Sequence, residues 1–242
     1  MRKSFAVAAG LLVSAALAAC NHERHEDPGP VVSKAFPVGD FQKIEVAGSY
    51  DVQVKTGGKP SVNVRGPQHL LEQMLVEVKD DELHIGARGR HGFHFNWGSH
   101  HDGVQVMVTV PALSGAAVAG SGNIDVDHVT GDKFTGSIAG SGELHVAAAE
   151  VKAVAINVAG SGDVQIAGKA DSAEYNIAGS GDLDASGLEA RDLNVSIAGS
   201  GNARGRATGT AKISIMGSGD AEVTGGAKCE VSKMGSGDAH CS

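Results

Sequence analysis

Apolar and polar residues alternate along most of this chain, and from residue 116 onward the alternation recurs at a nearly constant interval. The tripeptide Gly-Ser-Gly occurs seven times, and its first glycine falls at positions 120, 140, 160, 179, 199, 217 and 235. In most copies aliphatic residues stand at even offsets on both sides of that glycine. Alternation with a period of two indicates β-strands, and a repeat of 18–20 residues is typical of a solenoid in which like strands stack.

The two glycines of each repeat are predicted to form a sharp turn between two strands. At such a corner an inward side chain would clash, or a positive φ would be needed, and glycine meets both conditions. The predicted turn glycines are Gly120, Gly122, Gly140, Gly142, Gly160, Gly162, Gly179, Gly181, Gly199, Gly201, Gly217, Gly219, Gly235 and Gly237.

Residues 35–113 alternate without the tripeptide. Strand patterns cover 41–57, 61–66 and 104–111, a helix of about two turns is predicted after Pro67, and Asp80-Asp81 is predicted as the turn of a hairpin. The fold class is therefore all-β. We expect a parallel β-helix with about 18–20 residues per coil, plus an N-terminal strand-rich region with one short helix and a hairpin.

The first 19 residues have the pattern of a secretory signal peptide. A basic start precedes an apolar stretch over 5–19 that is too short to span a bilayer comfortably. The stretch ends in Leu-Ala-Ala-Cys, which resembles the lipobox of bacterial lipoproteins, so Cys20 is the predicted lipid attachment site. Ordinary signal-peptide cleavage after Ala18 or Ala19, which would leave a free Cys20, is the alternative. Residues 20–34 then form a lipidated tether, and Asn21 in place of an aspartate favours the outer membrane.

Two of the three cysteines remain after lipidation, which predicts a disulfide. Cys229 and Cys241 lie six residues before and six residues after Gly235, both at inward offsets. Exported proteins retain disulfides, so a bond that closes the terminal coil is expected. Two buried free thiols are the alternative.

The charge balance limits the kinds of molecule that this chain is expected to bind. The chain has 20 Lys+Arg and 28 Asp+Glu, a formal net charge of −8, which argues against nucleic acid. No nucleophile elbow, zinc-protease motif or phosphate-binding loop occurs in the sequence. No catalytic residue and no cofactor are predicted.

Polar residues three positions after the first turn glycine form a predicted surface column. They could cap their own turns through local hydrogen bonds, form a calcium-binding stripe, or act as a protein- or glycan-binding ridge. This candidate binding ridge consists of Asn123, Glu143, Asp163, Asp182, Asn202, Asp220 and Asp238.

Residues 87–103 concentrate histidine and aromatic side chains and form a candidate ligand loop. The pattern allows a ligand-stacking surface, a zinc or copper site, or a long hairpin whose aromatic rings pack on the solenoid. No spacing fixes four ligands, so no metal site is predicted. The loop residues are His91, Phe93, His94, Phe95, Trp97, His100 and His101.

These features together resemble the head GIN domain family of predicted adhesins. The resemblance rests on "FQKIEVAGSYDVQV", "VQVMVTVPALSGAAVAGSG" and the recurring "GSGD", and it covers residues 35–242. The literal tripeptide Gly-Ile-Asn is absent. The resemblance implies a parallel, right-handed β-helix on an exported protein, with no known catalysis.

The function expected from the sequence is that of a non-enzymatic envelope lipoprotein, either an adhesin or a binding scaffold. Its partners would be the membrane, through the lipid anchor, and an unknown protein or glycan. A periplasmic structural or envelope-stress lipoprotein is the main alternative. Two lesser alternatives are a calcium-binding solenoid and a β-helix enzyme that acts on polysaccharides.

Overall fold

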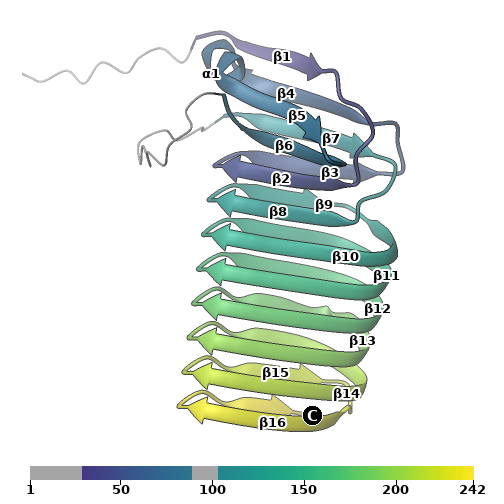
Figure 1. Cartoon of the computed structure of the whole chain (residues 1–242), viewed down its shortest axis with the longest axis vertical. Coiled ribbons are helices and arrows are strands. Elements are labelled where there is room, and N and C mark those ends of the chain that lie inside the picture. Colours follow the sequence, from purple (N-terminus) through teal and green to yellow (C-terminus); the bar gives the residue numbers. More distant parts are fainter. Residues whose placement is uncertain (1–28, 89–102) are drawn as a thin grey trace, which may run out of the picture.

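The computed structural model describes residues 29–88 and 103–242, and β-strands dominate this part of the chain (Figure 1). The predicted all-β class with one short helix and a hairpin is confirmed. The elements of the described ranges are β1 (Val31–Phe36), β2 (Lys43–Gly48), β3 (Asp51–Thr56), β4 (Ser61–Pro67), α1 (Gln68–Gln73), β5 (Met74–Lys79), β6 (Glu82–Ala87), β7 (Gln105–Val110), β8 (Gly115–Gly120), β9 (Asn123–Val126), β10 (Val129–Gly140), β11 (Glu143–Gly160), β12 (Asp163–Gly179), β13 (Leu183–Gly199), β14 (Ala203–Gly217), β15 (Ala221–Thr224), β16 (Lys228–Gly235) and β17 (Ala239–Cys241).

The repeats form the stack of coils that their period predicts. β8, β10, β11, β12, β13, β14 and β16 pair in parallel in that order, each with its equivalent in the next coil. The first turn glycines pair with one another from Gly120 to Gly235, so the turns lie in one line along the stack (Figure 1). Because the register is kept, inward side chains of successive coils form continuous columns.

The aliphatic residues at even offsets line the interior, as the alternation predicts. Ile138, Ile177 and Ile215, each two residues before a turn glycine, are 2% exposed. Phe134 and Tyr175 supply the larger buried side chains of the repeat region. Their neighbours in sequence point outward, so one face of each strand builds the core and the other is available for binding.

The turn glycines are required mainly by the stacking of coils. Gly199 has φ +137°, and a Cβ atom on it would come within 3.0 Å of the carbonyl oxygen of Gly179 in the preceding turn. A Cβ atom on Gly201 would approach Gly181 in the same way. Both predicted conditions therefore hold, but the backbone of the preceding coil, more than the interior, excludes a side chain.

One further coil precedes the seven repeats, and the sequence analysis missed it. β2 pairs with β8 so that Gly48 lies beside Gly120, and β3 pairs with β9 so that Asp51 lies beside Asn123. Gly48 has φ +124°. Residues 48–51 thus form a turn in which Tyr50 replaces the second glycine.

An antiparallel region covers the N-terminal end of this stack (Figure 1). β4 pairs antiparallel with β1 and β7, and β5 forms the predicted hairpin with β6, with Asp80 and Asp81 at positive φ. Two positive φ angles are the geometry of a tight hairpin turn, which aspartate tolerates.

The predicted short helix after Pro67 ends at Gln73, because Met74 already pairs with Ala87 in the β5–β6 ladder. One boundary in this region differs from the prediction. β1 begins at Val31, inside the predicted tether over 20–34, because Val31 and the residues that follow pair with β4. The last four residues of that segment therefore belong to the fold.

Candidate functional site

The predicted polar column exists, but its side chains bridge coils instead of capping their own turns. Asp163 Oδ1 accepts a hydrogen bond from the amide of Asp182 (3.0 Å), and Asp182 Oδ1 accepts one from the amide of Asn202 (3.1 Å). Asn202 Oδ1 and Asp220 Oδ1 accept from the amides of Asp220 (3.1 Å) and Asp238 (2.8 Å). Local capping, one of the three interpretations of the column, does not describe these four side chains, because each accepts its hydrogen bond from the next coil.

The amides in this column reduce its self-repulsion. Two carboxylates about 4.8 Å apart in water repel by roughly 0.9 kcal/mol. Asn202 interrupts the aspartates and donates from Nδ2 to Asp182 Oδ1 (2.9 Å), and Asn123 donates to Asp51 Oδ1 over 2.9 Å. Within 29–88 and 103–242 the column does not bring three metal-ligating groups together. Its hydrogen bonds join neighbouring coils.

The predicted disulfide between Cys229 and Cys241 is confirmed. Their Cα atoms are 6.6 Å apart, and they lie beside Ala211 and Val223 of the preceding coil. The bond joins the two sides of the last described coil. Cys20 and the candidate ligand loop, residues His91 to His101, lie outside the described residues, so those expectations stay predictions.

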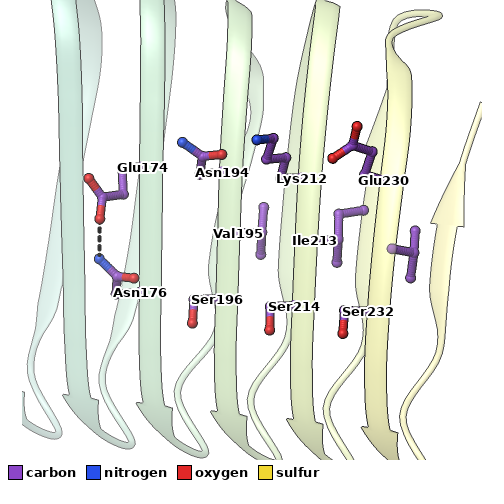
Figure 2. Close-up of a pocket in the computed structure, with 11 residues that line it drawn as sticks. Glu174, Asn176, Asn194, Val195, Ser196, Lys212, Ile213, Ser214, Glu230 and Ser232 are labelled. Atoms are coloured by element: carbon purple, nitrogen blue, oxygen red, sulfur yellow. Dashed lines mark hydrogen bonds between the residues drawn. The ribbon is translucent and has the colours of Figure 1, made fainter.

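A groove crosses the outer face of β12, β13, β14 and β16, and no sequence motif marked it. Its volume is about 520 Å³. Figure 2 shows two rows of side chains that run across the strands. One row is formed by Ser196, Ser214 and Ser232, and the other by Asn194, Lys212 and Glu230.

The floor of the groove between the two rows is not uniform. Val195 and Ile213 turn their side chains inward and are 3% and 2% exposed, whereas Val231, the equivalent residue on β16, is 48% exposed. Glu174 and Asn176 continue the two rows on β12 and are joined by a 3.1 Å hydrogen bond. In the sequence the serine row corresponds to a serine three residues before Gly199, Gly217 and Gly235, but Ser137 also stands three residues before Gly140 and does not line the groove.

The chemistry of the groove suits a ligand with many hydroxyl groups. Each serine hydroxyl can donate one hydrogen bond and accept two, Lys212 offers only donors, and Glu230 only acceptors when ionised. These groups repeat at the coil spacing of about 4.8 Å. An extended ligand that lies along the stack axis would therefore meet equivalent groups in successive coils.

A second hollow lies nearer the N-terminal end, over β3, β7, β9, β11 and β12. Its volume is about 410 Å³, and carboxylates and amides such as Asp51, Glu143 and Gln105 line it. His145 Nδ1 lies 3.3 Å from Asp125 Oδ1 within it. Met107 on its rim is 53% exposed. This hollow is more acidic than the groove.

Comparison with known proteins identifies the family. Residues 40–227 match the family described as "Putative auto-transporter adhesin, head GIN domain". The chain belongs to this family. No curated protein matches the head GIN chain at a significant level. Among the described residues no helix is long and apolar enough to cross a membrane.

Solved structures share the fold of this head GIN domain. A putative adhesin from Bacteroides fragilis superposes with a TM-score of 0.80 at 22% identity, covering 88% of this chain and 97% of that one. A putative adhesin from Parabacteroides distasonis gives 0.69 at 26% identity, with 88% and 98% covered. A putative lipid binding protein from Parabacteroides distasonis gives 0.69 at 22% identity, with 88% and 97% covered.

Proposed function

We propose that this head GIN protein is a non-enzymatic binding protein of the bacterial cell envelope. Membership of a family described as adhesins supports an envelope or extracellular location. The groove supports binding over catalysis, because its serines are chemically equivalent from coil to coil, whereas a reaction centre needs groups with distinct roles.

The proposed ligand is an extended, hydroxyl-rich chain such as a glycan, bound along the groove over β12 to β16. The observation that carries this proposal is the double row of polar side chains in register across successive coils. Sugar hydroxyls both donate and accept hydrogen bonds, and so do the serines that form one of the two rows.

The test is a glycan array with two variants that differ only in where a side chain is enlarged. Ser214→Leu would fill the centre of the groove and should abolish binding. Ser137→Leu is the matched control, because Ser137 stands at the same position of an earlier coil and does not line the groove. Equal loss of binding in both variants, or binding that survives in Ser214→Leu, would exclude the groove as the site.

The anchor is a separate proposal that rests on the lipobox-like motif. Cys20 would carry the lipid and hold the domain at the outer membrane through the segment that precedes β1. A fatty-acid analogue fed to cells should label the wild type and leave Cys20→Ser unlabelled. Equal labelling of both proteins would contradict the anchor.

Orientation at the membrane separates an adhesin from a periplasmic structural lipoprotein. A surface-facing protein should be cleaved when intact cells are treated with protease. A periplasmic one should be protected until the outer membrane is broken. The adhesin function proposed for the family requires the first result.

A further inference from the structure

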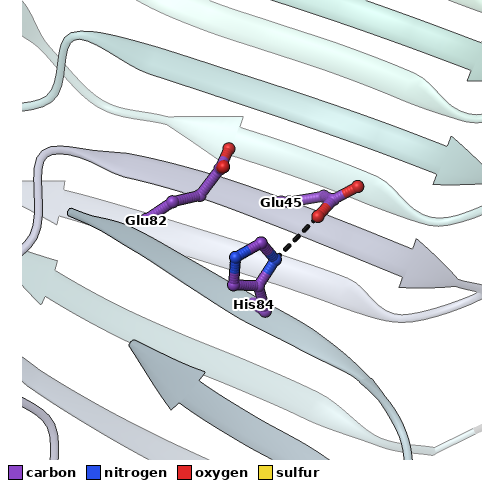
Figure 3. Close-up of side chains that lie close together, drawn as sticks. All are labelled: Glu45, Glu82 and His84. Atoms are coloured by element: carbon purple, nitrogen blue, oxygen red, sulfur yellow. Dashed lines mark hydrogen bonds and ion pairs between the residues drawn. The ribbon is translucent and has the colours of Figure 1, made fainter. Parts of the chain in front are cut away.

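Two glutamates and a histidine meet on the outer face of the N-terminal coil. Glu45 lies on β2, and Glu82 and His84 lie on β6, which pairs with β2 in parallel. The register places Glu45 directly beside His84, and Glu82 two residues earlier shares that face of the strand. One ligand atom from each residue lies within 4.8 Å of the others (Figure 3).

Only part of this cluster is satisfied within the protein. His84 Nδ1 lies 2.7 Å from Glu45 Oε2, and the two side chains are 30% and 39% exposed. The Glu82 carboxylate, also half-buried, makes no hydrogen bond or ion pair with any described residue. The Glu82 carboxylate is therefore available to a ligand next to the Glu45–His84 pair.

The charged side chains around the cluster carry a net negative charge, which favours a bound cation. Glu77 on β5 lies directly across from His84, and Lys43 and Lys79 flank Glu82 on either side. Neither lysine forms an ion pair with Glu82 in the described structure. The three glutamates and two lysines sum to one net negative charge.

We propose that Glu45, Glu82 and His84 bind a divalent first-row transition cation of the Zn²⁺ class. An imidazole nitrogen and two carboxylate oxygens are ligands that Zn²⁺ accepts, with water completing the coordination. The imidazole disfavours Ca²⁺ and Mg²⁺, which take oxygen ligands. The cation would tie the β5–β6 hairpin to the coil formed by β2 and β3.

The experiment is a calorimetric titration of untagged residues 21–242, which contain every described strand, with ZnCl₂. The loop histidines His91, His94, His100 and His101 are changed to glutamine in all samples, so that a loop site cannot contribute. In this background His84→Gln and Glu82→Gln should each weaken zinc binding by about tenfold or more. Because the Glu82 carboxylate has no partner among the described residues, Glu82→Gln should leave the fold intact, which its thermal midpoint without metal will show.

His145→Gln is the matched control. His145 pairs with Asp125 across two parallel strands, as His84 does with Glu45, but no third ligand gathers there among the described residues. Its zinc affinity should equal that of the background. Absence of stoichiometric zinc binding, equal affinity in His84→Gln and the background, or equally tight binding of Ca²⁺ would each overturn the proposal.

Discussion

Alanine at three glycines should separate the two reasons for glycine in this solenoid. Gly131 has φ +140°, but a Cβ atom there would meet nothing within 4 Å, so it tests backbone conformation alone. Gly201 has no positive φ, but its Cβ atom would lie within 3.0 Å of Gly181 and 2.8 Å from Ile177, so it tests crowding alone. Gly199 combines φ +137° with the clash against the preceding turn.

The expected losses follow from these three geometries. A residue forced to a sparsely populated φ costs about 1–3 kcal/mol. Overpacking costs about 1–3 kcal/mol, and alanine returns about 0.4–1 kcal/mol by restricting the unfolded chain. Gly131→Ala and Gly201→Ala should therefore each lose about 1 kcal/mol of unfolding free energy, and Gly199→Ala about 3 kcal/mol.

The assay is urea unfolding of the three variants, followed by circular dichroism and by native-state hydrogen exchange. Exchange is needed because a stack of coils can lose cooperativity, so that one midpoint no longer reports the whole chain. In Gly199→Ala the amides of β12 and β13, whose turn ends would be pushed apart, should exchange fastest. If Gly199→Ala loses no more stability than Gly131→Ala, contact with the preceding turn is not what requires glycine.

Four other changes test single interactions. Reduction of the Cys229–Cys241 bond should destabilise the last coil by roughly 3 kcal/mol in the chain-entropy model, and thiol counting on the denatured, unreduced protein should find neither cysteine reactive. Asp220→Ala should cost about 1 kcal/mol by leaving the amide of Asp238 without its acceptor, whereas Asp220→Asn should cost less, as measured by thermal unfolding. Tyr175→Phe should raise the unfolding free energy by about 1 kcal/mol, because the buried Tyr175 hydroxyl has no hydrogen-bond partner among the described residues; an unchanged or lower value would point to a bound water. Hydrogen bonds from the hydroxyl and the amide of Ser186 lower the pKa of Asp184. This contact therefore stabilises the fold above the ordinary pKa of aspartate, and the stabilisation is lost as the pH falls through the lowered pKa. In a pH series of thermal midpoints, Ser186→Ala should lose the stabilisation that the hydroxyl of Ser186 contributes over this acidic range.

The repeated half of the fold could be predicted because each coil obeys the same local rules. Inward residues such as Ile138 and Ile215 stand at fixed even offsets from the turn, so the period reveals both the strands and the core. The same argument placed Cys229 and Cys241 at inward positions, and the pair is bonded. Here the spacing along the chain determines the spacing in the structure.

Two features could not be predicted from the sequence: a turn that an insertion separates from the repeats, and hydrogen bonds that depend on the neighbouring coil. The turn at Gly48 is separated from the next one at Gly120 by β4 to β7, so the interval hides that it belongs to the same stack. Asp163 could be placed on the surface, but a bond to Asp182, 19 residues later, depends on the exact stacking register. Local capping rules describe a single turn and cannot include a partner from the next coil.

The groove proposed as the binding site lies where the outward positions of a stack of equivalent coils differ from coil to coil. Its serine row occupies one outward position, which holds Ala117, Ser137, Asn157 and Asn176 in earlier coils and Ser196, Ser214 and Ser232 in the last three. Inward positions must stay apolar and turn positions must stay glycine, so outward positions are where coils can differ without loss of the stack. The shortening from asparagine to serine removes side-chain volume from the face, while Lys212 and Glu230 keep long side chains beside it. A departure from the repeat at outward positions is therefore the sequence signal for a binding site in such a fold, whereas the repeat itself reports only the scaffold.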